Sequence, residues 1–168
     1  MADLALGLEN PAMDFVERQE LVQQYRHGHA AVVSSLAGIT EAELDERPPA
    51  DAWTAREIVH HLADSETNSY IRLRKLIAED NPTLIAYDEA EWARCLHYGR
   101  SIGPSLAVLK AVRDASAQLL DALPPSDWQR SGTHPEHGAY SIDTWLEVYA
   151  AHAVDHVEQI QRARKGVA

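Results

Sequence analysis

Three histidines have the type and spacing of a metal site. His152 and His156 lie four positions apart. On a helix such side chains share one face, so two imidazoles can reach one point. Histidine is the commonest metal ligand in proteins. A third imidazole, from the adjacent pair His60 and His61, would complete a site with three protein ligands and open positions, as catalytic metal sites have. Adjacent helical residues point about 100° apart, so only one of this pair can serve.

The spacing alone leaves other interpretations open. The same histidines could be core residues whose ring nitrogens are satisfied by hydrogen bonds, with no metal at all. A second pair, His134 and His137, could also supply ligands. The proline between them and the glycine that follows favour a turn instead.

Composition limits the class of protein. The 168 residues suit one domain with a proper core, and 24% charged and 45% hydrophobic residues are ordinary for a globular chain. The net charge of −11 argues against nucleic acid as a partner, because no basic surplus is available to neutralise phosphates. The single cysteine, Cys95, excludes an internal disulfide and a cysteine-based zinc site. We expect Cys95 to be a small buried core residue.

Two further features concern location. The N-terminal residues lack the basic and apolar regions of a signal peptide. No uncharged run approaches the ~20 residues that a membrane span needs. We therefore expect a cytoplasmic protein that does not interact with membranes.

Four amphipathic segments predict the helices that must position the histidines. Apolar residues recur with helical period in residues 14–36, 54–79, 103–123 and 141–165. Thr40 with Glu43, and Thr54 with Glu57, have the spacing of capping boxes that begin helices. Residues 1–13 are expected to form a loose N-terminal arm, and 14–168 the domain.

Two long connections separate these helices. Residues 82–100 contain a short helical piece at 88–96, and residues 126–140 form the second link. A sustained period-two run and a hairpin turn signal are both missing, so we expect no strands. The sequence therefore predicts an all-α four-helix bundle with long crossover connections. The first link can cross the end of the bundle and allow parallel neighbours, and bundle cores commonly hold metal sites.

Several short motifs resemble signatures of one family. The segment 53–66, Trp-Thr-Ala-Arg-Glu-Ile-Val-His-His-Leu-Ala-Asp-Ser-Glu, resembles the first signature of the DinB superfamily, and 149–156, Tyr-Ala-Ala-His-Ala-Val-Asp-His, resembles the second. Segments 64–72 and 87–92 are similar to the YfiT branch, a group assigned as metal-dependent hydrolases and related to bacillithiol S-transferases. The resemblance spans about residues 20–165.

The resemblance implies a specific site and fold. The family's three metal ligands fall on His61, His152 and His156, because the family ligand directly precedes the Leu-Ala-Asp segment. It implies nickel or zinc with water completing the shell, a bundle with an unusual crossover, and a small-molecule substrate. A low-molecular-weight thiol cofactor and a homodimer are further implications. Glu66 stands where the YfiT branch often has histidine, which weakens any inference about the substrate from that branch.

The leading hypothesis is an enzyme with a three-histidine metal site. A divalent ion at such a site can activate water for hydrolysis or hold a thiolate for thiol transfer. Glu66 is a candidate acid/base residue, with a surface position as the alternative. The rival hypothesis is a non-catalytic module that binds a metal or ligand and acts in stress response through a partner protein.

Overall fold

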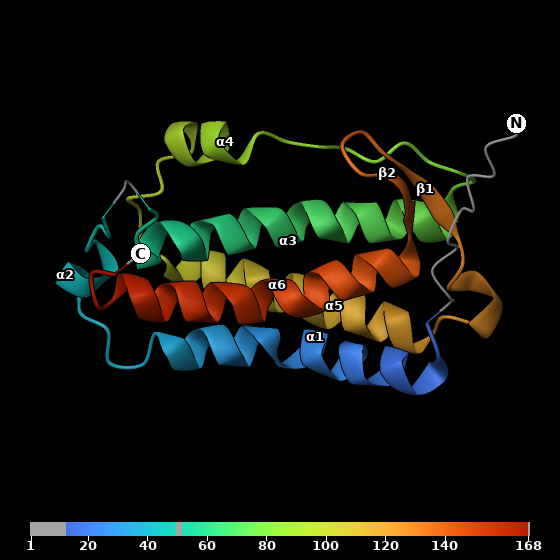
Figure 1. Cartoon of the computed structure of the whole chain (residues 1–168), viewed down its shortest axis with the longest axis horizontal. Helices are drawn as coiled ribbons and strands as arrows, with labels where there is room; N and C mark the ends of the chain where they lie inside the picture. Colours follow the sequence, from blue (N-terminus) through green and yellow to red (C-terminus); the bar gives the residue numbers. More distant parts are fainter. Residues whose placement is uncertain (1–12, 50–51, 168) are drawn as a thin grey trace, which may run out of the picture.

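Four long helices form a bundle in the computed structural model, which describes residues 13–49 and 52–167. Figure 1 shows α1 (Phe15–Ser35), α3 (Ala55–Ala78), α5 (Gly103–Asp121) and α6 (Ile142–Ala163). The predicted all-α four-helix bundle is confirmed. The shorter elements are α2 (Glu41–Leu44), α4 (Glu89–Cys95), the 3-10 turn η1 (Pro125–Asp127) and strands β1 (Ser131–His134) and β2 (Gly138–Ser141).

Side-chain caps fix where the helices begin. Asp14, Thr54 and Ser141 each accept a hydrogen bond from the backbone amide three residues later. Both predicted capping boxes, at Thr40 and Thr54, are present. These bonds satisfy amides that a helix leaves without partners in its first turn.

The first long link sets the topology of the bundle. It leaves the C-terminal end of α3, returns outside that helix through α4, and delivers the chain to α5 at the end where α3 began (Figure 1). Helices α3 and α5 are therefore parallel, and so are α1 and α6. The length of this link allowed parallel neighbours, and the link reaches them by running along the side of the bundle and not across its end.

The prediction that the chain has no strands is wrong. Strands β1 and β2 form an antiparallel hairpin around the turn predicted for His134–Gly138. The Thr133 amide donates to Pro82 O (2.9 Å) and Thr133 O accepts from the Leu84 amide (2.9 Å), so the hairpin also ties down the first link. Strands of four residues are too short to show a period of two.

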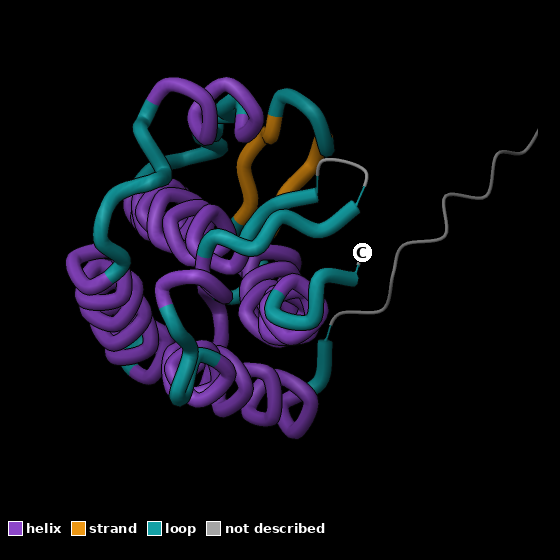
Figure 2. The backbone as a smooth tube through the Cα atoms, turned by 90° about the vertical axis from the view of Figure 1, so that its left-hand side faces the viewer, coloured by secondary structure: helices purple, strands orange, loops and turns teal. Residues whose placement is uncertain are grey.

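Cys95 is exposed, not buried as predicted. The reason is the position of α4, which carries no buried residue. Figure 2 shows this helix and its flanking loops outside the layer formed by the long helices. A small apolar residue in a helix predicts burial only if that helix belongs to the core.

Buried polar residues accumulate on α3. The core itself is apolar and is built mainly from α1, α3, α5 and α6. Within it α3 contributes a polar set with at most 9% exposure: Arg56, His60, His61, Ser65, Glu66, Ser69 and Arg72. Buried polar groups need partners, so this stretch of α3 is where a functional site is expected. The proposed arm lies almost wholly outside the described residues, apart from Met13, which is buried against the core.

None of the described helices has the length and apolarity to cross a membrane.

Candidate metal centre

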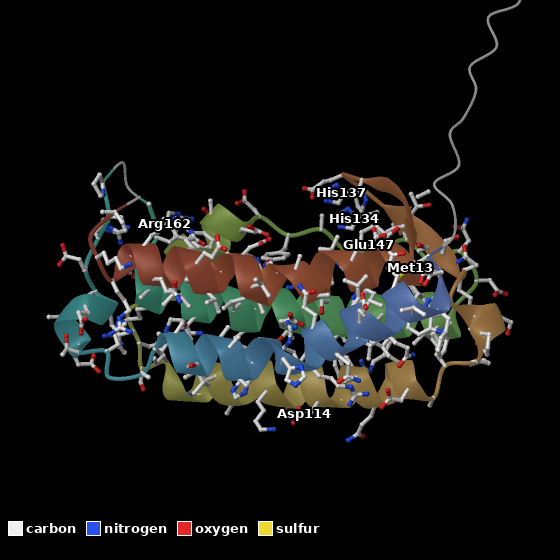
Figure 3. All side chains as sticks on the ribbon, turned by 60° about the horizontal axis from the view of Figure 1, so that its bottom comes forward. Met13, Asp114, His134, His137, Glu147 and Arg162 are labelled. Carbon is white, nitrogen blue, oxygen red and sulfur yellow. The ribbon has the colours of Figure 1, made fainter. Side chains whose placement is uncertain are left out.

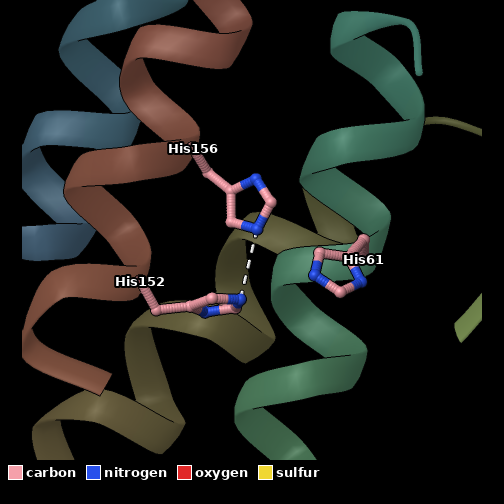
Figure 4. A group of neighbouring side chains, drawn as sticks. All are labelled: His61, His152 and His156. Atoms are coloured by element: carbon pink, nitrogen blue, oxygen red, sulfur yellow. Dashed lines mark hydrogen bonds between the residues drawn. The ribbon is translucent and has the colours of Figure 1, made fainter. Parts of the chain in front are cut away.

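The three predicted ligands come together between α3 and α6 (Figure 4). One nitrogen from each of His61, His152 and His156 lies within 4.8 Å of the others. Nε2 of His152 and Nε2 of His156 are 3.2 Å apart. Two imidazole nitrogens bound tetrahedrally to zinc would be separated by about 3.3 Å. The donor set and its spacing therefore fit a divalent metal ion.

His60 takes no part in this cluster, in agreement with the prediction that only one of the two adjacent histidines can be a ligand. Its Nδ1 is 2.8 Å from Ser105 Oγ, and its Nε2 is 3.0 Å from Arg100 O. Both ring nitrogens therefore have protein partners. His60 is a satisfied core histidine that joins α3 to α5 and to the segment before it.

Burial keeps the cluster neutral. It lowers the pKa of His61 to about 3, with the charge of His156 as a second cause. Burial also lowers the pKa values of His152 and His156. Neutral imidazole is the form that binds metal, so these rings are ready to act as ligands at neutral pH.

A neighbouring amide orients one ring. Gln159 Oε1 lies 2.7 Å from His156 Nδ1 and can only accept a hydrogen bond, so Nδ1 carries the proton. The Nε2 lone pair of His156 then faces His152 and is available to a metal. Nδ1 of His61 and of His152 are buried without a hydrogen-bond partner among the described residues. These two rings therefore have no protein group that fixes their tautomers in the way that Gln159 fixes that of His156.

A second cluster in the hairpin turn is less suited to a metal. Ligand atoms of His134, Glu136 and His137 also lie within 4.8 Å of one another. However, His134 Nδ1 accepts from the Glu136 amide at 3.2 Å, and burial lowers the pKa of this ring. A neutral ring in that state carries its proton on Nε2, so His134 is a hydrogen-bond donor with no free lone pair. The turn that the sequence predicted is the better description.

A cavity of about 370 Å³ adjoins the histidine cluster through His152. Its walls come from α3, α6, the hairpin and the first link, and Figure 3 shows His134 and His137 at the hairpin beside α6. The lining residues with polar groups are Ser65, Arg72, Tyr87, Glu89, His134, Glu136, His137, Tyr140, Thr144, Tyr149 and His152. The volume is within the range of small-molecule sites.

Glu89 is a candidate functional residue that the sequence analysis missed. It lines this cavity and also the pocket formed by His61, His152 and His156. Although Glu89 is exposed at the pocket mouth, partial burial raises the pKa of its carboxyl. The segment 87–92 was singled out, but no pattern in it tells which of its three carboxylates faces the histidines.

Glu66, for which the sequence suggested an acid/base role or a surface position, lies in the interior of the bundle. The surface position is wrong, because the side chain has no exposed area. Its carboxylate forms an ion pair with Arg113 and accepts hydrogen bonds from Tyr25 Oη and Ser69 Oγ, both at 3.2 Å. These contacts favour a structural task, and the acid/base role stays a prediction.

Comparisons with known proteins agree on one family. Residues 24–160 match the family model of the DinB superfamily. A relative from Oceanobacillus iheyensis, named "Putative metal-dependent hydrolase", is 38% identical over 127 residues, covering 76% of this chain and 74% of the relative. A relative of the same name from Halalkalibacterium halodurans is 33% identical over 135 residues, covering 80% and 77%.

A solved structure matches the whole bundle. YfiT from Bacillus subtilis, described as "a probable metal-dependent hydrolase with an unusual four-helix bundle topology", superposes with a TM-score of 0.87 and is 26% identical. The match covers 94% of this chain and 93% of that one. The parallel pairs α1/α6 and α3/α5 are therefore placed on a known four-helix topology. With the family model matching most of its length, the chain belongs to the DinB superfamily.

Proposed function

We propose that this protein is a metal-dependent enzyme acting on a small molecule, with His61, His152 and His156 as the ligands of one divalent ion. The observation that carries the proposal is the convergence of three neutral imidazoles beside a cavity of small-molecule size. The names of the relatives, which specify a metal-dependent hydrolase, support it independently. Nickel and zinc are the ions we propose, because both accept imidazole ligands.

A bound ion would supply an activated water, or a stabilised thiolate, at this position. The chain's own residues supply the rest. Gln159 holds His156 in the tautomer that presents Nε2. Trp53 packs on the His61 ring, with centroids 4.7 Å apart, and limits its rotation. Three protein ligands leave open positions for water and substrate.

Glu89 is the group we propose to move protons at the site. It shares the pocket with the three histidines, and its raised pKa makes it a better proton acceptor than an ordinary carboxylate when ionised. It can take a proton from water or from a thiol and return it to the leaving group. Hydrolysis and thiol S-transfer both need this step, so a low-molecular-weight thiol remains a proposed co-substrate.

The alternative from another class is a non-catalytic module that binds a metal or ligand and acts through a partner. A fourth protein ligand would favour that role, because structural sites are closed. Among the described residues, the potential ligand group here contains three histidines and no fourth member. That observation favours the enzyme. A cytoplasmic location and a homodimer complete the proposal.

The test is metal content, measured by elemental analysis on protein purified without a metal-affinity tag. We expect about one equivalent of nickel or zinc in the wild type, and its loss in His61→Ala, His152→Ala and His156→Ala. His60→Ala is the matched control and should keep its metal, since both its ring nitrogens bind protein groups. A wild type that stays metal-free after incubation with zinc or nickel would refute the proposal.

A further inference from the structure

One of the buried arginines lacks an anionic partner. Arg56, Arg72 and Arg113 are all buried, with exposures of 5%, 9% and 1%. Arg56 pairs with two carboxylates and Arg113 pairs with Glu66. Among the described residues, no carboxylate forms an ion pair with Arg72, although the charge of Arg72 opposes the rise in the pKa of Glu89 from a greater distance. Burying a charge without a partner is strongly unfavourable, so the position of Arg72 calls for a functional explanation.

The protein contacts of Arg72 go to neutral oxygens. Its Nε and Nη2 donate to Ile85 O at 2.9 and 2.6 Å, and its Nη1 donates to Tyr149 Oη at 2.8 Å. These bonds fix the guanidinium between the first link and α6. Arginine has five N–H donors, so one donor on each terminal nitrogen has no acceptor among the described residues. The side chain is held in place with two donors free, and the Glu89 carboxylate in the cavity wall acts on it only from beyond contact distance.

Arg72 faces the cavity beside the metal centre. It lines that cavity together with Tyr149 and His152. Tyr149 links the two, because its hydroxyl accepts from Arg72 while its ring contacts the ring of His152, with centroids 5.9 Å apart. Arg72 lies three helical turns beyond His61 on α3, a rise of about 16 Å along the helix axis.

Two further donors lie in the same wall. The Tyr149 hydroxyl accepts from Arg72 and keeps its own proton, which it can donate. The neutral His134 ring carries a proton on Nε2. The carboxylates at the rim, Glu89 and Glu136, are exposed. The cavity is therefore electropositive at Arg72 and acidic at its mouth, an arrangement that suits one negative charge at a defined depth.

We infer that Arg72 is a specificity-determining residue for the proposed reaction, and that it binds a carboxylate of the substrate. A carboxylate offers two oxygens to the two terminal nitrogens of the fork, a pairing that arginine favours. The substrate class is then a small carboxylic acid whose reacting group lies several bonds from its carboxylate, at the metal centre. This inference rests on the proposed function for the identity of that reacting group.

The experiment compares an acid with its neutral analogue. Nitrogen-labelled protein is titrated with hexanoate and with hexanamide, and binding is followed by NMR. The proteins are the wild type, Arg72→Met and, as matched control, Arg74→Met. Arg74 lies two residues away on α3, bonds to Tyr70 O at 3.1 Å and lines a different pocket.

We expect the wild type to bind hexanoate roughly ten- to hundredfold tighter than hexanamide, the preference of a charge-assisted hydrogen bond. Arg72→Met should lose this preference and Arg74→Met should keep it. In the wild type, the acid alone should shift the side-chain Nε–H signal of Arg72 and the amides of Ile85 and Tyr149. That mapping requires no variant to fold. Equal affinities, or shifts confined to other regions, would overturn the inference.

Each titration is run on zinc-loaded and on chelator-treated protein. If Arg72 binds the carboxylate, the protein still prefers hexanoate to hexanamide after the metal is removed. If the ion binds the carboxylate, chelation abolishes that preference. If both preparations prefer hexanoate and the zinc-treated protein retains no metal, the metal-dependent function is refuted while the carboxylate site at Arg72 is supported. If the protein retains zinc but binds hexanoate and hexanamide equally well, only the carboxylate site at Arg72 is refuted.

Discussion

Arg113 on α5 and Glu66 on α3 form an ion pair at the centre of the bundle, with side-chain exposures of 1% and 0%. The pair joins all four long helices. Arg113 donates to Tyr25 O on α1 (2.9 and 2.6 Å) and to Tyr149 O on α6 (3.2 Å). Glu66 accepts from the Tyr25 hydroxyl. Burial raises the pKa of Glu66, and the charge of Arg113 together with these hydrogen bonds opposes that shift.

Breaking this pair should destabilise the fold strongly. In Glu66→Gln the shape is kept, but the Arg113 charge is left buried and unpaired, which costs about 3–5 kcal/mol of unfolding free energy. Urea unfolding measured near neutral pH gives this value. Asp114→Asn is the control, because its ion pair with Lys110 is half exposed, and the expected change is within about 0.5 kcal/mol. Equal effects of the two substitutions would contradict the structural role of Glu66.

Gly28 lets α1 approach the Arg113 side chain. A Cβ at this position would lie 2.5 Å from Arg113 Nη2 and 2.7 Å from the Ala153 Cβ. Gly28→Ala should therefore lower the unfolding free energy by about 1–3 kcal/mol, even though alanine is the better helix former. Thermal unfolding measures the loss. Gly99→Ala has no atom within 4 Å of the new Cβ and should be close to neutral; a stabilised Gly28→Ala would disprove this packing argument.

The sequence predicted the parts of the site that depend on local spacing. His152 and His156 face one way because they are four apart, and the caps at Thr54 and Ser141 fix where their helices begin. The ion pair between Glu66 and Arg113 could not be predicted in this way. It spans 47 residues and depends on the parallel packing of α3 and α5, which only the three-dimensional path of the first link determines.

The same limit explains the residues that were missed or misplaced. Glu89 lines a pocket with the three histidines, and Cys95 does not reach the core, because α4 lies outside α3. No pattern within α4 encodes that position. The hairpin was missed because its strands are short, and part of its stability comes from a partner 50 residues earlier, where Thr83 pairs with Thr133.

Gln159 should control metal affinity without being a ligand. In Gln159→Leu the His156 ring loses its hydrogen-bond acceptor and its fixed tautomer. Removing such a partner typically weakens metal binding by about 10- to 100-fold. Competition with a chelator of known zinc affinity measures the change. Gln161→Leu, an exposed position on the same helix, is the control, and an unchanged affinity in Gln159→Leu would mean that the amide does not orient the ring.

Glu89 should determine how activity depends on pH. As a base it must be ionised, and because partial burial raises its pKa, activity should rise with pH through that raised value and reach a plateau above it. Glu89→Gln should lower kcat/KM for an activated ester by about 100-fold or more and remove this limb of the profile. Metal content should stay at the wild-type level, because the three histidines are intact.

Glu91→Gln changes an exposed carboxylate of the same helix that pairs with Arg94, and it should leave the profile unchanged. A normal pH limb in Glu89→Gln would assign the proton transfer to another group, and loss of metal in that variant would make Glu89 a ligand instead.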